Sequence, residues 1–336
     1  MEIIWFCLVA VMIAVYVVLD GFDFGAGIVH LFLARSENER RQVLASIGPV
    51  WDGNEVWLLA GGGTLYFAFP SLYSSAFSGF YLALMLVLWL LILRGIAIEF
   101  RNHIDNPVWK PFWDVVFGGA SALLALVFGV ALGNVVRGVP LDESGSFFVP
   151  FWGHPGILDP YTVVIGAAAF CALAMHGCLW IAYKTDGPLY EKSRKIGGRM
   201  WYAVVALTIV ITYLSFQIQP QLGARFSSSP WGFAFPGLAL AGLIGVKIWN
   251  SGGSDLKAFL ASAIYMAGML CSAAFGVFPY VLPSYGQPNY GLTVYNTAAP
   301  HYGLTVGLWW FIPGMLLATG YSIFVYRHTA GKVRVE

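Results

Sequence analysis

Charged side chains are scarce in this sequence. Asp, Glu, Lys and Arg make up 10% of its 336 residues and apolar residues make up 58%, whereas ordinary soluble domains carry about 25% charged residues. Whole stretches lack charge, the longest from Ala258 to Tyr326. This composition excludes a soluble globular domain, and a net charge of +1 gives no support to a nucleic-acid partner.

Cysteine is almost absent. The four cysteines are Cys7, Cys171, Cys178 and Cys271. All fall in apolar stretches and none belongs to a Cys-x-x-Cys pair, so neither a disulfide framework nor a thiolate metal site is expected. We interpret them as small buried residues.

Histidine is also rare, and only His30 and His176 are expected inside the apolar stretches. A bis-His haem would need both on facing helices at one depth, so a hydrogen-bonded buried histidine is the favoured interpretation of His176. No phosphate-binding loop is present, because Gly61–Gly63 lies inside an apolar stretch without a following Gly-Lys-Ser/Thr. Soluble hydrolase chemistry is not indicated.

Apolar stretches long enough to cross a bilayer dominate the chain. A spanning helix needs about 20 apolar residues, so the longest stretches must each hold two spans. The expected helices are 3–32, 52–72, 75–98, 114–136, 158–183, 198–219, 230–249, 257–281 and 302–327. The sequence thus predicts an all-α integral membrane protein with nine transmembrane helices in one polytopic domain, 1–336.

The distribution of Lys and Arg predicts the orientation. Sixteen of the 18 basic residues fall on one side of the predicted spans, against Arg137 and Arg225 on the other. The sixteen are Arg35, Arg40, Arg41, Arg94, Arg101, Lys110, Lys184, Lys192, Arg194, Lys195, Arg199, Lys247, Lys257, Arg327, Lys332 and Arg334. Because cytoplasmic loops are enriched in Lys and Arg, we expect the N-terminus outside and the C-terminus in the cytoplasm.

The first helix is expected to remain in the protein. The chain begins Met1-Glu2 without a basic segment, and Asp20 and Asp23 are incompatible with a small-residue cleavage site. A cleavable signal peptide is therefore not predicted.

Six ionisable side chains are expected in the cytoplasmic half of the first three spans: Asp20, Asp23, Asp52, Glu55, Arg94 and Glu99. Charges at membrane depth cost about 2.5–3.5 kcal/mol each on insertion scales and usually mark a pathway or a site. Asp20 and Asp23 are three residues apart, as are Asp52 and Glu55, so each pair occupies one turn. The excess of acid over Arg94 predicts a cluster that holds a proton at a cytoplasm-facing proton or cation inlet.

A purely structural interpretation competes for some of these residues. Asp52 and Glu55 near the start of a helix are also stabilised by the helix dipole. Arg94 and Glu99 could be interfacial groups that extend to the membrane surface. Asp20 and Asp23 gain no such help in mid-helix, so they carry most of the prediction.

The outer loop from Pro283 to Gly303 is rich in Tyr, Gly and Pro. The favoured interpretation is a belt of interfacial aromatic residues. The alternative is a surface that contacts a quinone ring or a partner subunit.

Five segments resemble subunit II of the cytochrome bd-type quinol oxidases, including the cyanide-insensitive branch. They are "DGFDFGAG" (20–27), "WDGNEVWLLAGGGTLYFAFP" (51–70), "SAFSGFYLALMLVL" (75–88), "GVALGNVVRGVP" (129–140) and "FGVFPYVLPS" (275–284). The resemblance runs in order through nearly the whole chain, and its first two segments are quite specific.

The resemblance implies a heterodimer with a larger subunit I, which carries two b haems, a d-type haem and the quinol-oxidising loop. The complex reduces O2 to water with quinol electrons and cytoplasmic protons in the bacterial inner membrane. Subunit II is then the haem-free partner, holds no metal, and contributes a proton route. Small single-span subunits and, in some members, a structural quinone at an unspecified position are also implied.

The resemblance places the motif residues Asp20, Asp23 and Asp52 on that route, with Arg94 as a basic residue of the family. Glu55 stands where some members carry Gln, which makes an indispensable proton role for it doubtful and Asp52 the stronger candidate. Two alternatives stay open: a proton-coupled secondary transporter, although no inverted repeat is visible, and an assembly subunit whose acids only orient helices.

Overall fold

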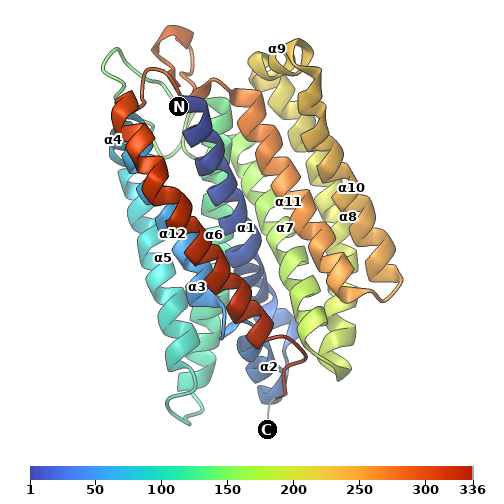
Figure 1. Cartoon of the computed structure of the whole chain (residues 1–336). Helices are drawn as coiled ribbons and strands as arrows, with labels where there is room; N and C mark the ends of the chain where they lie inside the picture. The colour runs from blue at the N-terminus through green and yellow to red at the C-terminus, as the bar shows by residue number, and fades with distance from the viewer. Residues whose placement is uncertain (335–336) are drawn as a thin grey trace.

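Long helices form most of residues 1–334, the part of the chain that the computed structural model describes (Figure 1). In that range nine helices have 18 residues or more. They are α1 (Glu2–Leu33), α3 (Trp51–Ala68), α5 (Tyr81–Phe100), α6 (Trp109–Arg137), α7 (Pro160–Lys184), α8 (Gly187–Ile218), α10 (Ala234–Ser251), α11 (Asp255–Val277) and α12 (His301–His328). The shorter elements are α2 (Glu37–Ile47), α4 (Pro70–Gly79), α9 (Pro220–Ser228), the 3-10 turns η1 (Pro230–Phe233) and η2 (Pro288–Tyr290), and the strands β1 (Tyr280–Leu282) and β2 (Leu292–Thr293).

Eight of the long helices in the described range are long and apolar enough to cross a membrane, and α3 is the exception. Asp52, Asn54 and Glu55 near its start lower its mean hydropathy. Its 18 residues still correspond to about 27 Å, close to the ~30 Å of a hydrocarbon core. The helix ends at Ala68 rather than at residue 72, because Pro70 lacks the N–H needed to continue it and instead begins α4.

Charged residues explain two further boundaries that hydropathy misplaced, the starts of α6 and α8. α5 runs from Tyr81 to Phe100, α6 begins at Trp109 rather than at 114, and α8 begins at Gly187 rather than at 198. The extra turns of α6 and α8 carry Lys and Glu side chains that the apolar pattern assigned to loops. The helix α2 was not predicted, although Ser36 and Glu39 form a reciprocal capping box at its start.

The loop at the N-terminal end of the bundle contains a small two-stranded sheet. β1 and β2 pair antiparallel, with Tyr280 opposite Thr293. The fold is therefore mostly helical, and this hairpin is an exception. Most of the hairpin lies in the segment that the sequence analysis predicted to connect the last two spans.

The four cysteines are unpaired. Cys178 is buried, while Cys171 and Cys271 are half-buried. The prediction of burial is wrong for Cys7, which is exposed.

The connections that hold most of the basic residues lie at one end of the bundle. The chain segments after α1, α5, α7 and α10 lie at the same end as the end of α12, while α1 begins at the other end (Figure 1). We call this the basic end. The Lys and Arg distribution predicted that these segments lie together at one end.

α1 is the central helix, and every residue from Asp20 to His30 on it is buried. It packs against α3, α6, α7 and α11. At its crossing with α7 the two backbones meet at Gly25 and Gly177. A Cβ added to Gly177 would lie 2.2 Å from the carbonyl carbon of Gly25, so glycine is required for this approach. The crossing sets the depth and rotation of Asp20 and Asp23.

Gly177→Val should therefore disrupt the fold. The added side chain would collide with backbone atoms of α1, which cannot move as a flexible side chain can. We expect a destabilisation at or above the upper end of the roughly 1–3 kcal/mol that overpacking costs. The yield and thermal stability of detergent-extracted protein measure it. Gly119→Val on α6 is the matched control, because nothing lies within 4 Å of its added Cβ. Equal behaviour of both variants would contradict this role of the crossing.

Candidate functional site

The Arg94 side chain lies fully buried where α1, α3 and α5 meet. Its Nη2 donates a hydrogen bond of 2.7 Å to Asp20 Oδ1 on α1, and it also donates to Glu55 on α3. Its guanidinium carbon lies 4.3 Å from the centre of the Phe24 ring. An isolated buried cation would be very costly, so these contacts hold the three helices in a fixed relation.

Asp23 is buried beside this arrangement without a cation of its own. Its Oδ2 accepts a hydrogen bond of 2.7 Å from the Asn54 side chain. Asn54 in turn accepts a 2.8 Å hydrogen bond from the Tyr326 hydroxyl. α12 thus reaches the site through Tyr326. We call Asp20, Asp23, Glu55 and Arg94 the Arg94 cluster.

The Arg94 cluster contains three carboxyl groups and one guanidinium. With every group ionised, its net charge is −2, and one bound proton reduces this to −1. Asp20 Oδ2 and Asp23 Oδ1 have no hydrogen-bond partner among the described residues. Buried polar atoms are normally paired with protein or water. The cluster therefore offers two acceptor atoms at which a proton or a water molecule can bind.

Two of the six predicted site residues lie outside the Arg94 cluster. Asp52 is exposed in the first turn of α3. Glu99 is exposed at the end of α5, where its backbone carbonyl contacts His103. Glu55 contacts Arg94 directly and its side chain is 24% exposed. The structure thus brings together Asp20, Asp23, Glu55 and Arg94, and adds Asn54 and Tyr326, which sequence reasoning missed.

Comparison with known proteins identifies the family. Residues 1–329 match the family described as cytochrome bd terminal oxidase subunit II. The chain belongs to this family.

Its relatives are subunits of bacterial cytochrome oxidases. The chain is 32% identical to a probable cytochrome oxidase subunit 2 of Haemophilus influenzae, over 99% of this chain and 95% of the relative. It is 29% identical to the cytochrome bd-I ubiquinol oxidase subunit 2 of Escherichia coli K12 (100% and 96%). It is 30% identical to the cytochrome bd ubiquinol oxidase subunit 2 of Bacillus subtilis (96% and 95%).

The fold is shared with the bd oxidase from Geobacillus thermodenitrificans. The TM-score is 0.76 over 97% of each chain, at 16% sequence identity. Because of the family match and these relatives, this chain is subunit II of a quinol:oxygen oxidoreductase complex and a multi-pass protein of the bacterial inner membrane.

This bd oxidase subunit II contains a second buried ionic group that the sequence did not reveal. Asp114 on α6 lies 2.5 Å from His30 Nε2 and accepts hydrogen bonds from Arg101 (2.6 Å) and Arg40 (2.8 Å). Arg101 also donates to both carboxylate oxygens of Glu37 on α2. We call these five residues the Asp114 cluster. The sequence predicted a helix over 114–136 and assigned no role to Asp114.

The Asp114 cluster attaches α2 to the basic end of the bundle. The hydrogen bond from Arg101 lowers the pKa of Glu37. A carboxyl group with a lowered folded-state pKa stabilises the fold at neutral pH, and this contribution is lost as the pH falls through that pKa. Glu37 is half exposed, so water screens the contribution.

The histidines at membrane depth do not fit a bis-His haem. His176 Nε2 lies 3.0 Å from the Val18 carbonyl oxygen, which can only accept, so Nε2 carries the hydrogen. The other nitrogen, Nδ1, lies 2.6 Å from the Ser262 hydroxyl. The prediction of a hydrogen-bonded buried His176 is confirmed. Among residues 1–334, no group of three or more His, Cys, Asp or Glu side chains is arranged to hold a metal ion.

Asp114→Asn should destabilise subunit II strongly. The change removes the charge that pairs with Arg101, whose side chain is 1% exposed. Breaking a buried ion pair from one side costs about 3–5 kcal/mol. Thermal unfolding of the purified protein measures the loss. Asp105→Asn is the control, because that carboxylate is 95% exposed and such a surface pair contributes about 0–1 kcal/mol. Equal stability of the two variants would show that the Asp114 cluster is not a structural anchor.

Proposed function

We propose that this chain is the haem-free subunit II that delivers cytoplasmic protons toward a haem-bearing subunit I. The observation that carries the proposal is the Arg94 cluster: three carboxyl groups share one buried guanidinium, and two carboxyl oxygens have no partner in residues 1–334. The two b haems and the d haem of the complex belong to subunit I in this proposal. This fits His176, whose two ring nitrogens are engaged.

We propose nine crossings in a single membrane domain, residues 1–336, with the basic end in the cytoplasm and the N-terminus outside. α3 is then the ninth span, and its polar start lies at the cytoplasmic surface. Support comes from the basic connections that gather at one end of the bundle (Figure 1). Cytoplasmic segments are enriched in Lys and Arg in the same way.

The proton route runs inward from the start of α3. Asp52 is exposed, Glu55 is 24% exposed, and Asp20 is fully buried. Asp52 and Glu55 are three residues apart on one helix and so occupy neighbouring positions on its surface. Asp52 would take a proton from water, Glu55 would pass it beside Arg94, and Asp20 and Asp23 would hold it in the buried cluster. In this order Glu55 is the link between the surface and the core.

The family assignment gives no support to a proton-coupled secondary transporter. The remaining competitor is an assembly subunit in which the carboxyl groups only position helices. A variant of Asp52 distinguishes a proton-delivering subunit from an assembly subunit. Asp52 is exposed, so its replacement does not remove a buried contact that holds helices together.

Asp52→Asn and Glu55→Gln should each slow quinol-driven O2 consumption with haem content unchanged. Each change removes one proton-accepting site and keeps the side-chain shape. We expect Glu55→Gln to lower turnover by about tenfold, equal to about 1.4 kcal/mol in the barrier, and Asp52→Asn to have a smaller effect. An oxygen electrode measures the rates and absorption spectra measure the haem. Glu191→Gln, an exposed acid of α8, is the control. Wild-type rates in both test variants would remove α3 from the route.

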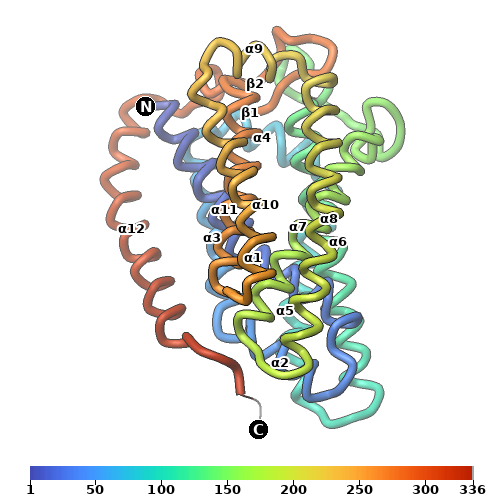
Figure 2. The backbone as a smooth tube through the Cα atoms, turned by 90° about the vertical axis from the view of Figure 1, so that its right-hand side faces the viewer, coloured from blue at the N-terminus to red at the C-terminus, as the bar shows by residue number. Residues whose placement is uncertain are grey.

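We propose that subunit I packs against α3 and α12. None of the most apolar 18-residue window of α12 is buried, and the helix stands at the edge of the bundle (Figure 2). Trp309 and Trp310 on it are 76% and 78% exposed. Nothing lies within 4 Å of a Cβ added to Gly63 on α3 or Gly314 on α12. Small residues of this kind allow a second helix to approach closely in a membrane. Small single-span subunits and a structural quinone stay predictions from the resemblance.

Gly63→Leu should weaken the association with subunit I. The added side chain would keep the partner helix away from α3 without colliding with this chain. We expect an affinity-tagged subunit II variant to lose the large subunit and its haem d absorption band. Gly119→Leu on α6 adds the same side chain at another open glycine and should retain both. Retention of the large subunit by Gly63→Leu would place the contact elsewhere.

A further inference from the structure

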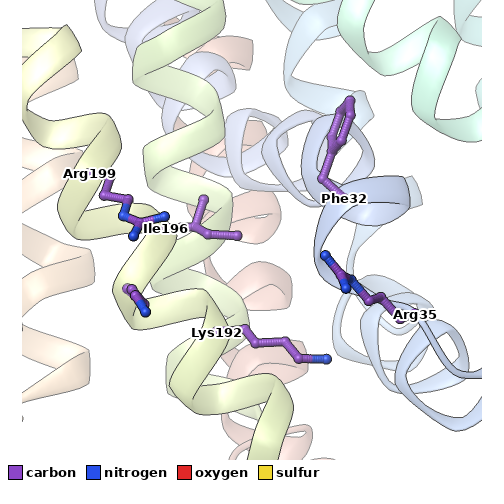
Figure 3. A pocket seen from close by; sticks show the side chains of 6 residues that line it. Phe32, Arg35, Lys192, Ile196 and Arg199 are labelled. Carbon is purple, nitrogen blue, oxygen red and sulfur yellow. The ribbon is translucent and has the colours of Figure 1, made fainter.

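A pocket of about 420 Å³ opens at the basic end between the end of α1 and the start of α8. Six residues line it: Phe32, Arg35, Lys192, Lys195, Ile196 and Arg199 (Figure 3). Four of the six are basic and none is acidic. Nothing in the proton route or the Asp114 cluster uses this pocket.

The basic side chains converge because of their spacing. Lys192, Lys195 and Arg199 are three and four residues apart on α8, so they occupy one face of that helix. Arg35 follows the end of α1 and lies across the pocket from them (Figure 3). Loop charges that serve only to set membrane orientation need not meet at one point. Here two separate elements direct cations to one concavity.

Most of this positive charge is not neutralised within the chain. Lys192 donates a 2.6 Å hydrogen bond to Glu39 Oε1. The same carboxylate also accepts from the backbone N–H groups of Arg35 and Ser36. Within residues 1–334, no ion pair or hydrogen bond engages the side chains of Arg35, Lys195 or Arg199. One carboxylate therefore faces four cations, and an anion from outside the chain would complete the site.

The pocket lies at the level expected of lipid headgroups. α8 has 32 residues, or about 48 Å, which exceeds the ~30 Å of a hydrocarbon core. Its charge-free part begins directly after Arg199 and continues past Ile218. Arg199 thus marks the boundary at which α8 leaves the hydrocarbon.

The surroundings of the pocket suit acyl chains. Phe32, on its rim, is 74% exposed. Only 6% of the most apolar window of α8 is buried inside the protein. Ile209 and Tyr213, further along α8, are 66% and 65% exposed. An apolar surface therefore extends from the cationic pocket into the membrane, and a small free anion would use none of it.

We propose that this pocket binds the phosphate headgroup of an anionic phospholipid of the leaflet at the basic end, with the acyl chains along α8. Arg is well suited to bidentate phosphate contacts, and basic pockets between membrane helices bind anionic headgroups. The bound lipid would join the end of α1 to α8 across the pocket. Both the cations and the adjoining apolar surface are then occupied by one molecule.

The test measures lipid binding to the whole purified complex by native mass spectrometry. Phosphatidylglycerol is the probe and phosphatidylcholine is the zwitterionic comparison. We expect wild-type complex to bind phosphatidylglycerol at least tenfold more tightly than phosphatidylcholine. Lys195→Gln/Arg199→Gln should abolish this preference, with the haem spectrum as the check on assembly. Excess inorganic phosphate should not displace the bound lipid, because phosphate lacks acyl chains.

Lys247→Gln/Lys257→Gln is the matched control, since it removes two basic residues at the same end but outside the pocket. An equal loss of binding in this control would show nonspecific attraction and overturn the proposal. Displacement of the lipid by inorganic phosphate would overturn it as well, in favour of a free-anion site. Should the double variant not assemble, Lys195→Gln and Arg199→Gln alone provide the same comparison. Each is expected to weaken phosphatidylglycerol binding at least threefold, and wild-type binding in both would reject the site.

Discussion

The buried guanidinium of Arg94 determines how α1, α3 and α5 can meet. A fully buried cation requires carboxylate partners, and Asp20 and Glu55 supply them from two different helices. The close crossing of α1 and α7 at Gly25 and Gly177 fixes α1 at the depth where this contact forms. Helix packing and ionic pairing therefore support each other at the centre of the protein.

The Arg94 cluster contains more carboxyl groups than guanidinium groups. This excess of acid allows the cluster to bind a proton. A purely structural ion pair would need one carboxylate for Arg94, whereas three carboxyl groups surround it. Asp23 has only the amide of Asn54 as its partner. Tyr326 reaches Asn54 from α12, so the cluster is linked to the helix that we propose as part of the subunit I interface. Proton binding and subunit association thus involve neighbouring residues.

Hydropathy and charge were sufficient to predict the approximate positions of the long apolar helices and the gathering of basic segments at one end, but not the short helix α2 or several helix ends. Both depend on properties summed over about 20 residues, which single side chains hardly alter. The pairing of side chains was not predictable in the same way, because the sequence does not state how each helix is rotated. Asp52 ranked above Glu55 on the family motif, yet Glu55 is the one that contacts Arg94. Asp114 lies at the predicted start of a helix, where a carboxylate is common. Its partners come from three other segments of the chain.

The most direct measurement is proton uptake by the complex with Asp23→Asn. Asp23 forms no ion pair, so the change removes a protonatable group and leaves the Arg94 contacts in place. Inside-out membrane vesicles would expose the basic end, and a pH indicator in the outer medium would follow uptake after reduced complex is mixed with O2. Slower proton uptake with an unchanged initial phase of haem oxidation is the expected result. Uptake at the wild-type rate, or from the opposite side, would contradict a proton route through the Arg94 cluster.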